Sequence, residues 1–299
     1  MTPVEVVEAL REAGLDLRPG EIALEIHGDR VAVRLPGDRM AWLPANARGR
    51  EHLEIERRVL KLLNERCTFR IPKLLFCGHG GWDLRTLAPG EVDPTGYAAR
   101  LKADAALLLR TARFLGSALA EQHSRIQQAD VASWLPRVVS WPMARETLQA
   151  QVPLVIDDAE LRGRIARAMA AYWSQEVDER DRALVHADLG LHNLAFDPTT
   201  GDATGLFDYG DAAWVDRHHD FRYLVFGAIP DALLDATLRA YAELTGLALR
   251  RDRILLYNAA CAISHLAFRV GSAPEEEVAG RTLAQDLVWT RWALKRSGF

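Results

Sequence analysis

The sequence predicts an α+β fold of two lobes, with a small antiparallel sheet followed by a larger, mostly helical part. Between residues 21 and 44, three short apolar runs are separated by Gly28-Asp29 and Gly37-Asp38, and such turns are typical of antiparallel strands. From Pro94 onward, Ala- and Leu-rich stretches with helical spacing dominate. We therefore expect lobes over residues 1–87 and 88–299.

Composition indicates an ordinary globular protein. The chain has 299 residues, of which 49% are hydrophobic and 26% charged. The net charge is 37 − 41 = −4, which argues against a nucleic-acid partner. No apolar run approaches the roughly 18 residues of a membrane span, and the first residues do not resemble a secretory signal. Because the three cysteines are not clustered, we expect reduced thiols and a cytoplasmic location. The sequence leaves monomer and homodimer open.

The first lobe should contain two helices around its strands. Thr2-Pro3-Val4-Glu5 is a capping box with proline in the first helical turn, and Gly14 should end that helix. A second helix is expected from about Arg48 to Asn64. One more strand is expected at residues 72–77, and residues 82–91 should hold the last strand followed by the connection between the lobes.

The second lobe should be built from long amphipathic helices. Apolar residues recur at helical spacing over five stretches, and proline residues interrupt the segment from 127 to 145. The expected helices cover residues 97–123, 157–174, 231–245, 251–270 and 274–295.

The stretch from Ala183 to Asp220 concentrates polar residues between short apolar runs. Two of these runs flank Asp197-Pro198-Thr199-Thr200-Gly201 and should form a β-hairpin. In such a hairpin, Asn193 and Asp208 lie at the same edge, and Asp188 lies on the loop that leads to it. The hairpin thus brings two carboxylates and one amide together.

These side chains suit phosphoryl transfer. Mg²⁺ that bridges nucleotide phosphates prefers a few oxygen ligands, for which Asn193 and Asp208 are candidates. Asp188 is the candidate base that accepts the proton of an attacking hydroxyl. The order His-x-Asp-x-x-x-x-Asn, then Asp-aromatic-Gly, is that of the kinase catalytic and metal loops.

At these residues the chain resembles the aminoglycoside phosphotransferase-like kinases, through VHADLGLHNLAFD and GLFDYGDA. The resemblance implies a bilobal protein-kinase-like fold and transfer of the γ-phosphoryl of ATP, or GTP, with Mg²⁺. It also implies that His186 and Asp220 support the catalytic loop. The chain departs from the family pattern at Tyr209, where Phe or Trp is usual, and at Gly190-Leu191-His192, where His-Pro-Gly is common.

The strand lysine of kinases is the most serious departure. That lysine binds the α- and β-phosphates and pairs with a helix glutamate. Glu56 is the best match for the glutamate, with Glu54 second. Trp42 stands in the lysine position if residues 39–44 form the third strand, and Arg34 is the basic alternative if residues 30–36 do. A kinase-like protein that binds without catalysing is therefore the rival interpretation.

The remaining nucleotide and substrate contacts are less distinctive. Gly28 either contacts the phosphates or is present only because its tight turn requires glycine. In the connection between the lobes, the backbone groups of Thr86, Leu87 and Ala88 are candidates to bind the nucleotide base. The resemblance favours an aminoglycoside or similar antibiotic as the hydroxyl acceptor, with a sugar, amino alcohol or nucleoside as alternatives. Candidates for acceptor recognition are Asp211 and Asp216. The acidic run of residues 275–277 either begins a helix or contacts a cationic acceptor.

Overall fold

The N-terminal lobe is a five-stranded antiparallel sheet in this computed structural model, which describes residues 2–226, 229–278 and 280–299. The first three strands follow one another as a meander, as the Gly-Asp turns predict. Gly28 and Gly37 adopt φ of 61° and 76° in these turns, a conformation that glycine enters without strain. The strands, in spatial order, are β1 (Leu24–His27), β2 (Arg30–Leu35), β3 (Arg39–Pro44), β5 (Asp83–Thr86) and β4 (Leu74–Cys77).

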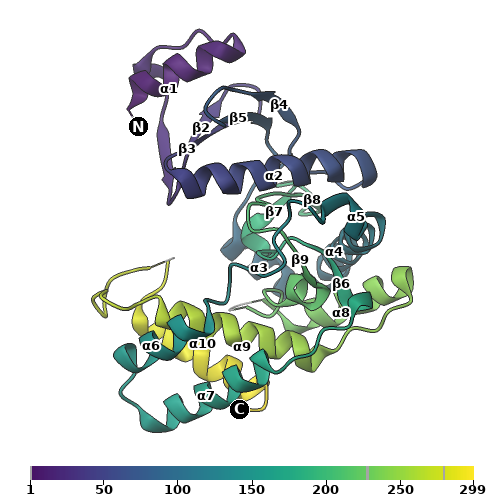
Figure 1. The fold of residues 1–299 in the computed structure, drawn as a ribbon. Helices are drawn as coiled ribbons and strands as arrows, with labels where there is room; N and C mark the ends of the chain where they lie inside the picture. Colours follow the sequence, from purple (N-terminus) through teal and green to yellow (C-terminus); the bar gives the residue numbers. More distant parts are fainter. Residues whose placement is uncertain (1, 227–228, 279) are drawn as a thin grey trace.

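Helix α1 (Pro3–Leu10) covers one face of this sheet (Figure 1). The predicted capping box is present, with Glu5 N donating to Thr2 Oγ1 at 3.4 Å and Thr2 N donating to Glu5 Oε2 at 2.6 Å. The helix was expected to end at Gly14, but it ends at Leu10, and Gly14 ends the short 3₁₀ turn that follows. Val6 and Leu10 pack in one apolar cluster with sheet residues, Val7 is also buried, and Val4 is exposed.

Helix α2 (Ala47–Arg66) lies between the sheet and the helical lobe (Figure 1). Asn46 caps it by accepting from Gly49 N at 3.0 Å. Its buried face is apolar except at Glu56. That side chain is 4% exposed, and a charge this deeply buried requires partners.

The second lobe is mostly helical, as predicted, but two of the expected helices have other bounds, and the helix Arg145–Val155 was not expected. The helix expected over residues 97–123 is two helices, because Asp104 interrupts it and caps the second one by accepting from Ala106 N and Leu107 N. The last helix begins only at Leu283, so residues 275–277 are not in its first turn. The helices are α3 (Pro94–Ala103), α4 (Ala105–Arg125), α5 (Gln128–Val131), α6 (Arg145–Val155), α7 (Ala159–Trp173), α8 (Asp231–Thr245), α9 (Arg251–Ala267) and α10 (Leu283–Arg296).

Two β-ribbons cross the upper part of this lobe. The predicted hairpin is present as β7 (Leu194–Phe196) and β8 (Ala203–Leu206), with Leu194 opposite Leu206. The other ribbon pairs β6 (Arg182–Val185) with β9 (Ala213–Asp216), a partner for β6 that the sequence had not indicated. Both ribbons contribute to the apolar core beneath the lobe interface.

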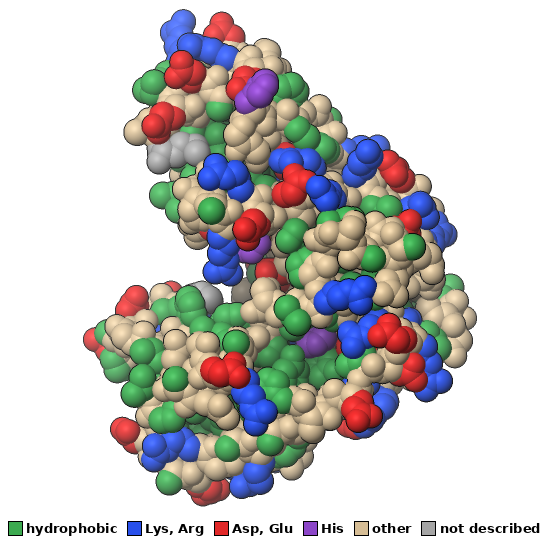
Figure 2. Space-filling view, in the orientation of Figure 1, with side chains coloured by type: hydrophobic (Ala, Val, Ile, Leu, Met, Phe, Trp, Pro, Cys, Tyr) green, Lys and Arg blue, Asp and Glu red, His purple; other side chains and the backbone are tan. Residues whose placement is uncertain are grey.

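The two lobes border a deep notch, visible in the space-filling view (Figure 2). Hydrophobic side chains are frequent on the helical side of this notch, and charged ones on the sheet side. Within the described residues, no helix combines the length and apolar character needed to cross a membrane. The lobe boundary after residue 87 stays a prediction.

Candidate active site

The loop after β6 is fixed by one buried carboxylate. Asp220 accepts hydrogen bonds from His186 N at 3.1 Å and Ala187 N at 3.0 Å. On the other side it contacts Gln122 Nε2 at 3.0 Å and His123 Nε2 at 2.9 Å. Ala187 has φ of 66°, which is strained for a residue with a side chain. The Asp220 carboxylate stabilises this strained turn by satisfying its buried amides.

His186 connects this loop to the loop that follows β8. Its Nε2 lies 2.8 Å from Phe207 O, and its ring packs on Tyr209 with centroids 4.3 Å apart. The buried Tyr209 hydroxyl donates to Gln122 Oε1 at 3.0 Å. Gln122 therefore provides the polar partner that a tyrosine needs at a position where the related kinases carry Phe or Trp.

Asp188 is oriented by two neighbours on the same oxygen. His192 Nε2 lies 3.2 Å from Asp188 Oδ2, and Asn193 Nδ2 donates to that oxygen at 3.1 Å. Asp188 Oδ1 has no hydrogen-bond partner in the described part of the chain. One carboxylate oxygen is thus held in place while the other remains open to an incoming hydroxyl.

The ionisation of Asp188 follows from the same contacts. Burial alone would raise the pKa of Asp188, but the hydrogen bond and charge of His192 lower it below its usual value. Conversely, burial opposes protonation of His192, yet Asp188 raises the pKa of His192 above its usual value. The carboxylate is therefore ionised at neutral pH, as a proton acceptor must be.

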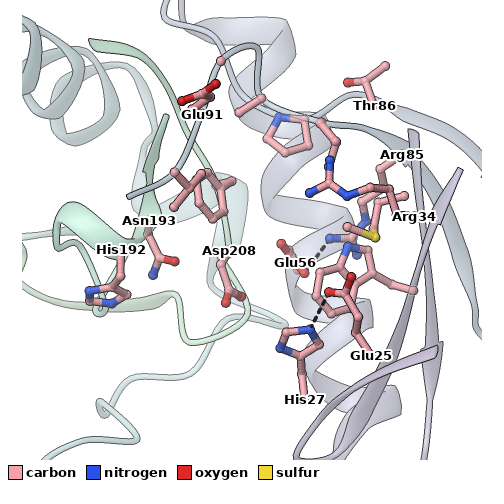
Figure 3. Close-up of a pocket in the computed structure, with 18 residues that line it drawn as sticks. Glu25, His27, Arg34, Glu56, Arg85, Thr86, Glu91, His192, Asn193 and Asp208 are labelled. Carbon is pink, nitrogen blue, oxygen red and sulfur yellow. Dashed lines mark ion pairs between the residues drawn. The ribbon is translucent and has the colours of Figure 1, made fainter. Parts of the chain in front are cut away.

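Asn193 and Asp208 lie side by side at the end of a cavity between the lobes (Figure 3). Asn193 uses its Nδ2 on Asp188, so its Oδ1 remains available as a ligand. Burial in the protein interior and the nearby charge of Glu56 raise the pKa of Asp208. A cation at this point would relieve that repulsion.

These two oxygen donors fit Mg²⁺, which keeps several waters and takes one or two protein ligands beside phosphate oxygens. Among the described residues, no group of three or more His, Cys, Asp or Glu side chains could hold a metal alone.

Glu56 is the centre of an ion-pair network that joins the lobes. Its carboxylate lies 2.5 Å from Arg85 Nη1 and 3.5 Å from Arg30 Nη1, and it accepts from Tyr209 N at 3.3 Å. Arg30 Nη1 also lies 3.4 Å from Asp208 Oδ1. Burial opposes ionisation, but the two arginines lower the pKa of Glu56 below its usual value. Helix α2 and the loop after β8 are thereby linked through one charged side chain.

The cavity has a volume of about 670 Å³ and lies between the sheet and the two loops. Arg34, Glu56 and Arg85 line the cavity from the sheet lobe. The connection between the lobes lines it with Thr86, Leu87 and Ala88. Leu87 N donates to Asp38 O at 2.7 Å. Gly28 is not among the lining residues, although its neighbour His27 is. A space of this size holds a ligand as large as a nucleotide.

A family model described as the phosphotransferase enzyme family, APH, matches residues 25–254. The chain belongs to this phosphotransferase family. Streptomycin 3''-kinase of Streptomyces griseus is 30% identical over 107 residues, which cover 34% of this chain and 39% of that kinase. The sequence match thus spans about two fifths of the length of this APH relative.

Solved APH structures show that the kinase-like fold extends over nearly the whole chain. A variant of aminoglycoside 2'-phosphotransferase-IIIa in complex with GDP is 18% identical, with a TM-score of 0.74 over 99% of this chain and 96% of that one. Macrolide 2'-phosphotransferase MphH from Brachybacterium faecium is 19% identical, with a TM-score of 0.64 over 98% of both chains. The expected bilobal kinase-like fold is confirmed.

The two carboxylates suggested for acceptor recognition lie in different surroundings. Asp211 is partly exposed, and Ser140 Oγ donates to it at 2.5 Å. Asp216 is 1% exposed and contacts Tyr257 Oη at 2.6 Å and Arg253 Nε at 3.0 Å. Burial alone would raise the pKa of Asp216, but the hydrogen bond and charge of His218 lower it below its usual value. Because protein partners already surround Asp216, we assign it a structural role in place of acceptor recognition.

Three residues near this APH site escaped sequence reasoning. Arg30 and Arg85 are ordinary strand residues in the sequence, and only strand register and helix packing bring them to Glu56. His192 stands where the family commonly has glycine. This departure from the family pattern was a signal that the side chain could reach Asp188.

Proposed function

We propose that the protein transfers the γ-phosphoryl group of ATP or GTP to a hydroxyl of a small polar molecule. The observation that carries this proposal is the meeting of Asp188, Asn193 and Asp208 at one end of the interlobe cavity. Asn193 and Asp208 line the cavity, and the third residue, Asp188, accepts a hydrogen bond from Asn193 Nδ2 at 3.1 Å. Membership of the phosphotransferase family supports the reaction class.

In this proposal Asp188 is the proton acceptor. Its Oδ1 receives the hydrogen bond of the acceptor hydroxyl, while His192 and Asn193 hold Oδ2 and so aim the carboxylate. As the hydroxyl oxygen forms its bond to the γ-phosphorus, its proton passes to Asp188 and the nucleoside diphosphate leaves. Asn193 Oδ1 and Asp208 hold Mg²⁺, which supplies charge neutralisation for the phosphates when bound.

The nucleotide occupies the cavity with its base toward the connection between the lobes. Thr86, Leu87 and Ala88 line that end, and Arg34 lines the sheet side. Gly28, in the β1–β2 turn, does not line the cavity, but its neighbour His27 does, so this turn is the candidate cover for the phosphates. The GDP in one related structure supports a guanine nucleotide, so both ATP and GTP are to be tested.

The acceptor binds on the helical side of the notch. Asp211 is a candidate contact there. An aminoglycoside is the first acceptor to test, because streptomycin kinase is a relative by sequence and an aminoglycoside phosphotransferase is one by fold. Macrolides belong in the panel because a macrolide phosphotransferase shares the fold.

The deciding experiment is a phosphoryl-transfer assay with γ-³²P-labelled ATP and GTP, Mg²⁺, and a panel of hydroxyl compounds. The panel contains aminoglycosides, macrolides, sugars, amino alcohols and nucleosides. We expect labelled product with at least one class and none with the Asp188→Asn protein. Nucleotide binding without transfer to any class would favour the non-catalytic interpretation.

A further inference from the structure

We infer that Arg85, on strand β5, supplies the phosphate-binding cation that kinases otherwise take from a lysine on the third strand. The inference rests on the proposed function, because it assigns a role within the same nucleotide site. It follows from the strand register around the cavity and from the partners of Glu56.

The third strand offers no cation to the cavity. Met40 and Trp42 of β3 both line the cavity, so the alternating side chains of this strand place Arg39 on the other face. Arg39 is the one basic residue of β3, and its Nε donates to Pro36 O at 2.9 Å. Trp42 thus occupies the position from which a lysine would extend.

Arg85 fulfils both structural relations of that lysine from the neighbouring strand. It pairs with Met40 across the sheet and therefore projects from the same face as Trp42. It lines the cavity, and its Nη1 lies 2.5 Å from Glu56 Oε2 (Figure 3). The helix glutamate is therefore paired with a cavity cation, as in kinases, but from a different strand.

Arg85 retains donors for a ligand. Nη1 pairs with Glu56 and Nη2 donates to Asp83 Oδ2 at 2.6 Å, which fixes the guanidinium between two carboxylates. An arginine has five N–H donors, and Arg85 Nε–H has no hydrogen-bond partner among the residues that the structure describes. Because the side chain is 2% exposed, this unpaired donor is costly to bury unless a ligand satisfies it. Phosphate oxygens are the acceptors that a guanidinium binds best.

The two other arginines nearby fit the role less well. Arg34 lines the cavity but is exposed, and it forms no ion pair within the described residues. Arg30 lies between Glu56 and Asp208 and stacks over Trp42 at 5.4 Å, but it does not line the cavity. Arg30 therefore holds the metal-binding loop, and Arg85 is left as the cation that meets the phosphates.

Replacing Arg85 should weaken binding of phosphates and spare binding of the nucleoside. We would titrate the full chain with ATP, GTP, adenosine and guanosine in Mg²⁺, and compare wild type with Arg85→Met. Loss of a charged hydrogen bond predicts about 10- to 100-fold weaker triphosphate binding, with nucleoside affinity unchanged. Arg58→Met, at an exposed ion pair on α2, is the matched control and should bind all four like wild type.

Trp42→Lys provides a rescue. In Arg85→Met, Glu56 keeps Arg30 and Asp83 keeps Arg57, so the fold should survive. Adding Trp42→Lys should restore most of the lost triphosphate affinity, because it returns a cation to the third strand. If Arg85→Met does not fold, the double variant is measured alone and should prefer ATP or GTP over the nucleoside as wild type does.

Several results would overturn the inference. Equal losses for nucleoside and triphosphate would show that Arg85 only holds the sheet to α2, and a selective loss confined to Arg34→Met would assign the role to Arg34. A double variant without preference for the triphosphate would also contradict it. If wild type binds and transfers while Arg85→Met matches it, the inference alone fails. If wild type neither binds nor transfers, the proposed function fails.

Discussion

The two sides of the interlobe cavity differ in how closely they follow the kinase pattern. On the helical side, Asp188, Asn193 and Asp208 stand in the expected order and spacing. On the sheet side, the lysine position holds Trp42, and two arginines from other strands pair with Glu56. Each of the three side chains on the helical side has a distinct geometric task. A cation that faces phosphates can extend from any strand that borders the cavity.

The comparison becomes sharpest at Asp188, where we expect the largest effect. Asp188→Asn removes the proton acceptor but keeps the size of the side chain, so turnover should fall by about 10²- to 10⁴-fold. Nucleotide affinity should change little, because Asp188 does not line the cavity. Steady-state kinetics and nucleotide titration would measure both. Asp202→Asn, at an exposed ion pair near the hairpin turn, is the control, and near-normal turnover in Asp188→Asn would refute the base assignment.

Asp208 tests whether both sides of the cavity meet at the metal. Asp208→Asn should weaken Mg²⁺-dependent nucleotide binding by about 100-fold, since even residues that support metal ligands contribute 10- to 100-fold. Binding measured in EDTA should be far less affected. Calorimetric titration with and without Mg²⁺ would show this. Equal affinity of wild type and variant in Mg²⁺ would remove Asp208 from the metal site.

His192 departs from the family pattern on the helical side of the cavity, which otherwise follows that pattern. Without this side chain Asp188 loses one of its two orienting contacts. A hydrogen bond contributes about 1 kcal/mol, which corresponds to a roughly fivefold change in rate, so His192→Ala should lower turnover by roughly fivefold. Gly190→Ala should have a similar effect, because its Cβ would lie 2.6 Å from the His192 ring and displace it.

A double-mutant cycle separates this contact from general disturbance. In the His192→Ala background, Gly190→Ala should cause little further loss of turnover, since the ring that it displaces is absent. Additive losses would show that the two positions act independently. That outcome would count against a role for His192 in orienting Asp188.

Acid should destabilise the helical lobe. Burial lowers the pKa of His123 and His219, and lowers that of His265 to about 4. Unfolded histidine has a pKa near 6.5, so the unfolded chain binds more protons as the pH falls below that value. This part of the stability is therefore present above about pH 6.5 and lost on acidification, by about 1 kcal/mol for His265 between pH 7 and 5.5. The raised pKa of His192 acts in the opposite direction.

His265→Gln isolates one share of this acid effect. Urea unfolding at pH 7 and pH 5.5 should show that the variant loses about 1 kcal/mol less stability than wild type over this interval. The same loss in both proteins would contradict the prediction for His265.

The sequence predicted those parts of the molecule that depend on local spacing. The hairpin after Asn193, the capping box at Thr2 and the strand meander with its Gly-Asp turns all follow from residues close together in the chain. Asp104 was missed because its capping bonds to Ala106 and Leu107 compete with a helical pattern that continues through it. Arg85 was missed because its role depends on its register with Met40 and on the packing of α2.

The two ribbons of the helical lobe have a consequence for how the site tolerates change. Strand β6 leads into the loop of residues 186–193 and β7 leaves it, whereas β8 leads into the loop of residues 207–212 and β9 leaves it. Strand β6 pairs with β9, and β7 pairs with β8. Each strand that flanks one loop is therefore hydrogen-bonded to a strand that flanks the other loop, so both loops are anchored at both ends. Residues inside the loops, such as Gly190 and His192, can therefore be exchanged while the frame that carries Asp188 and Asp208 keeps its shape.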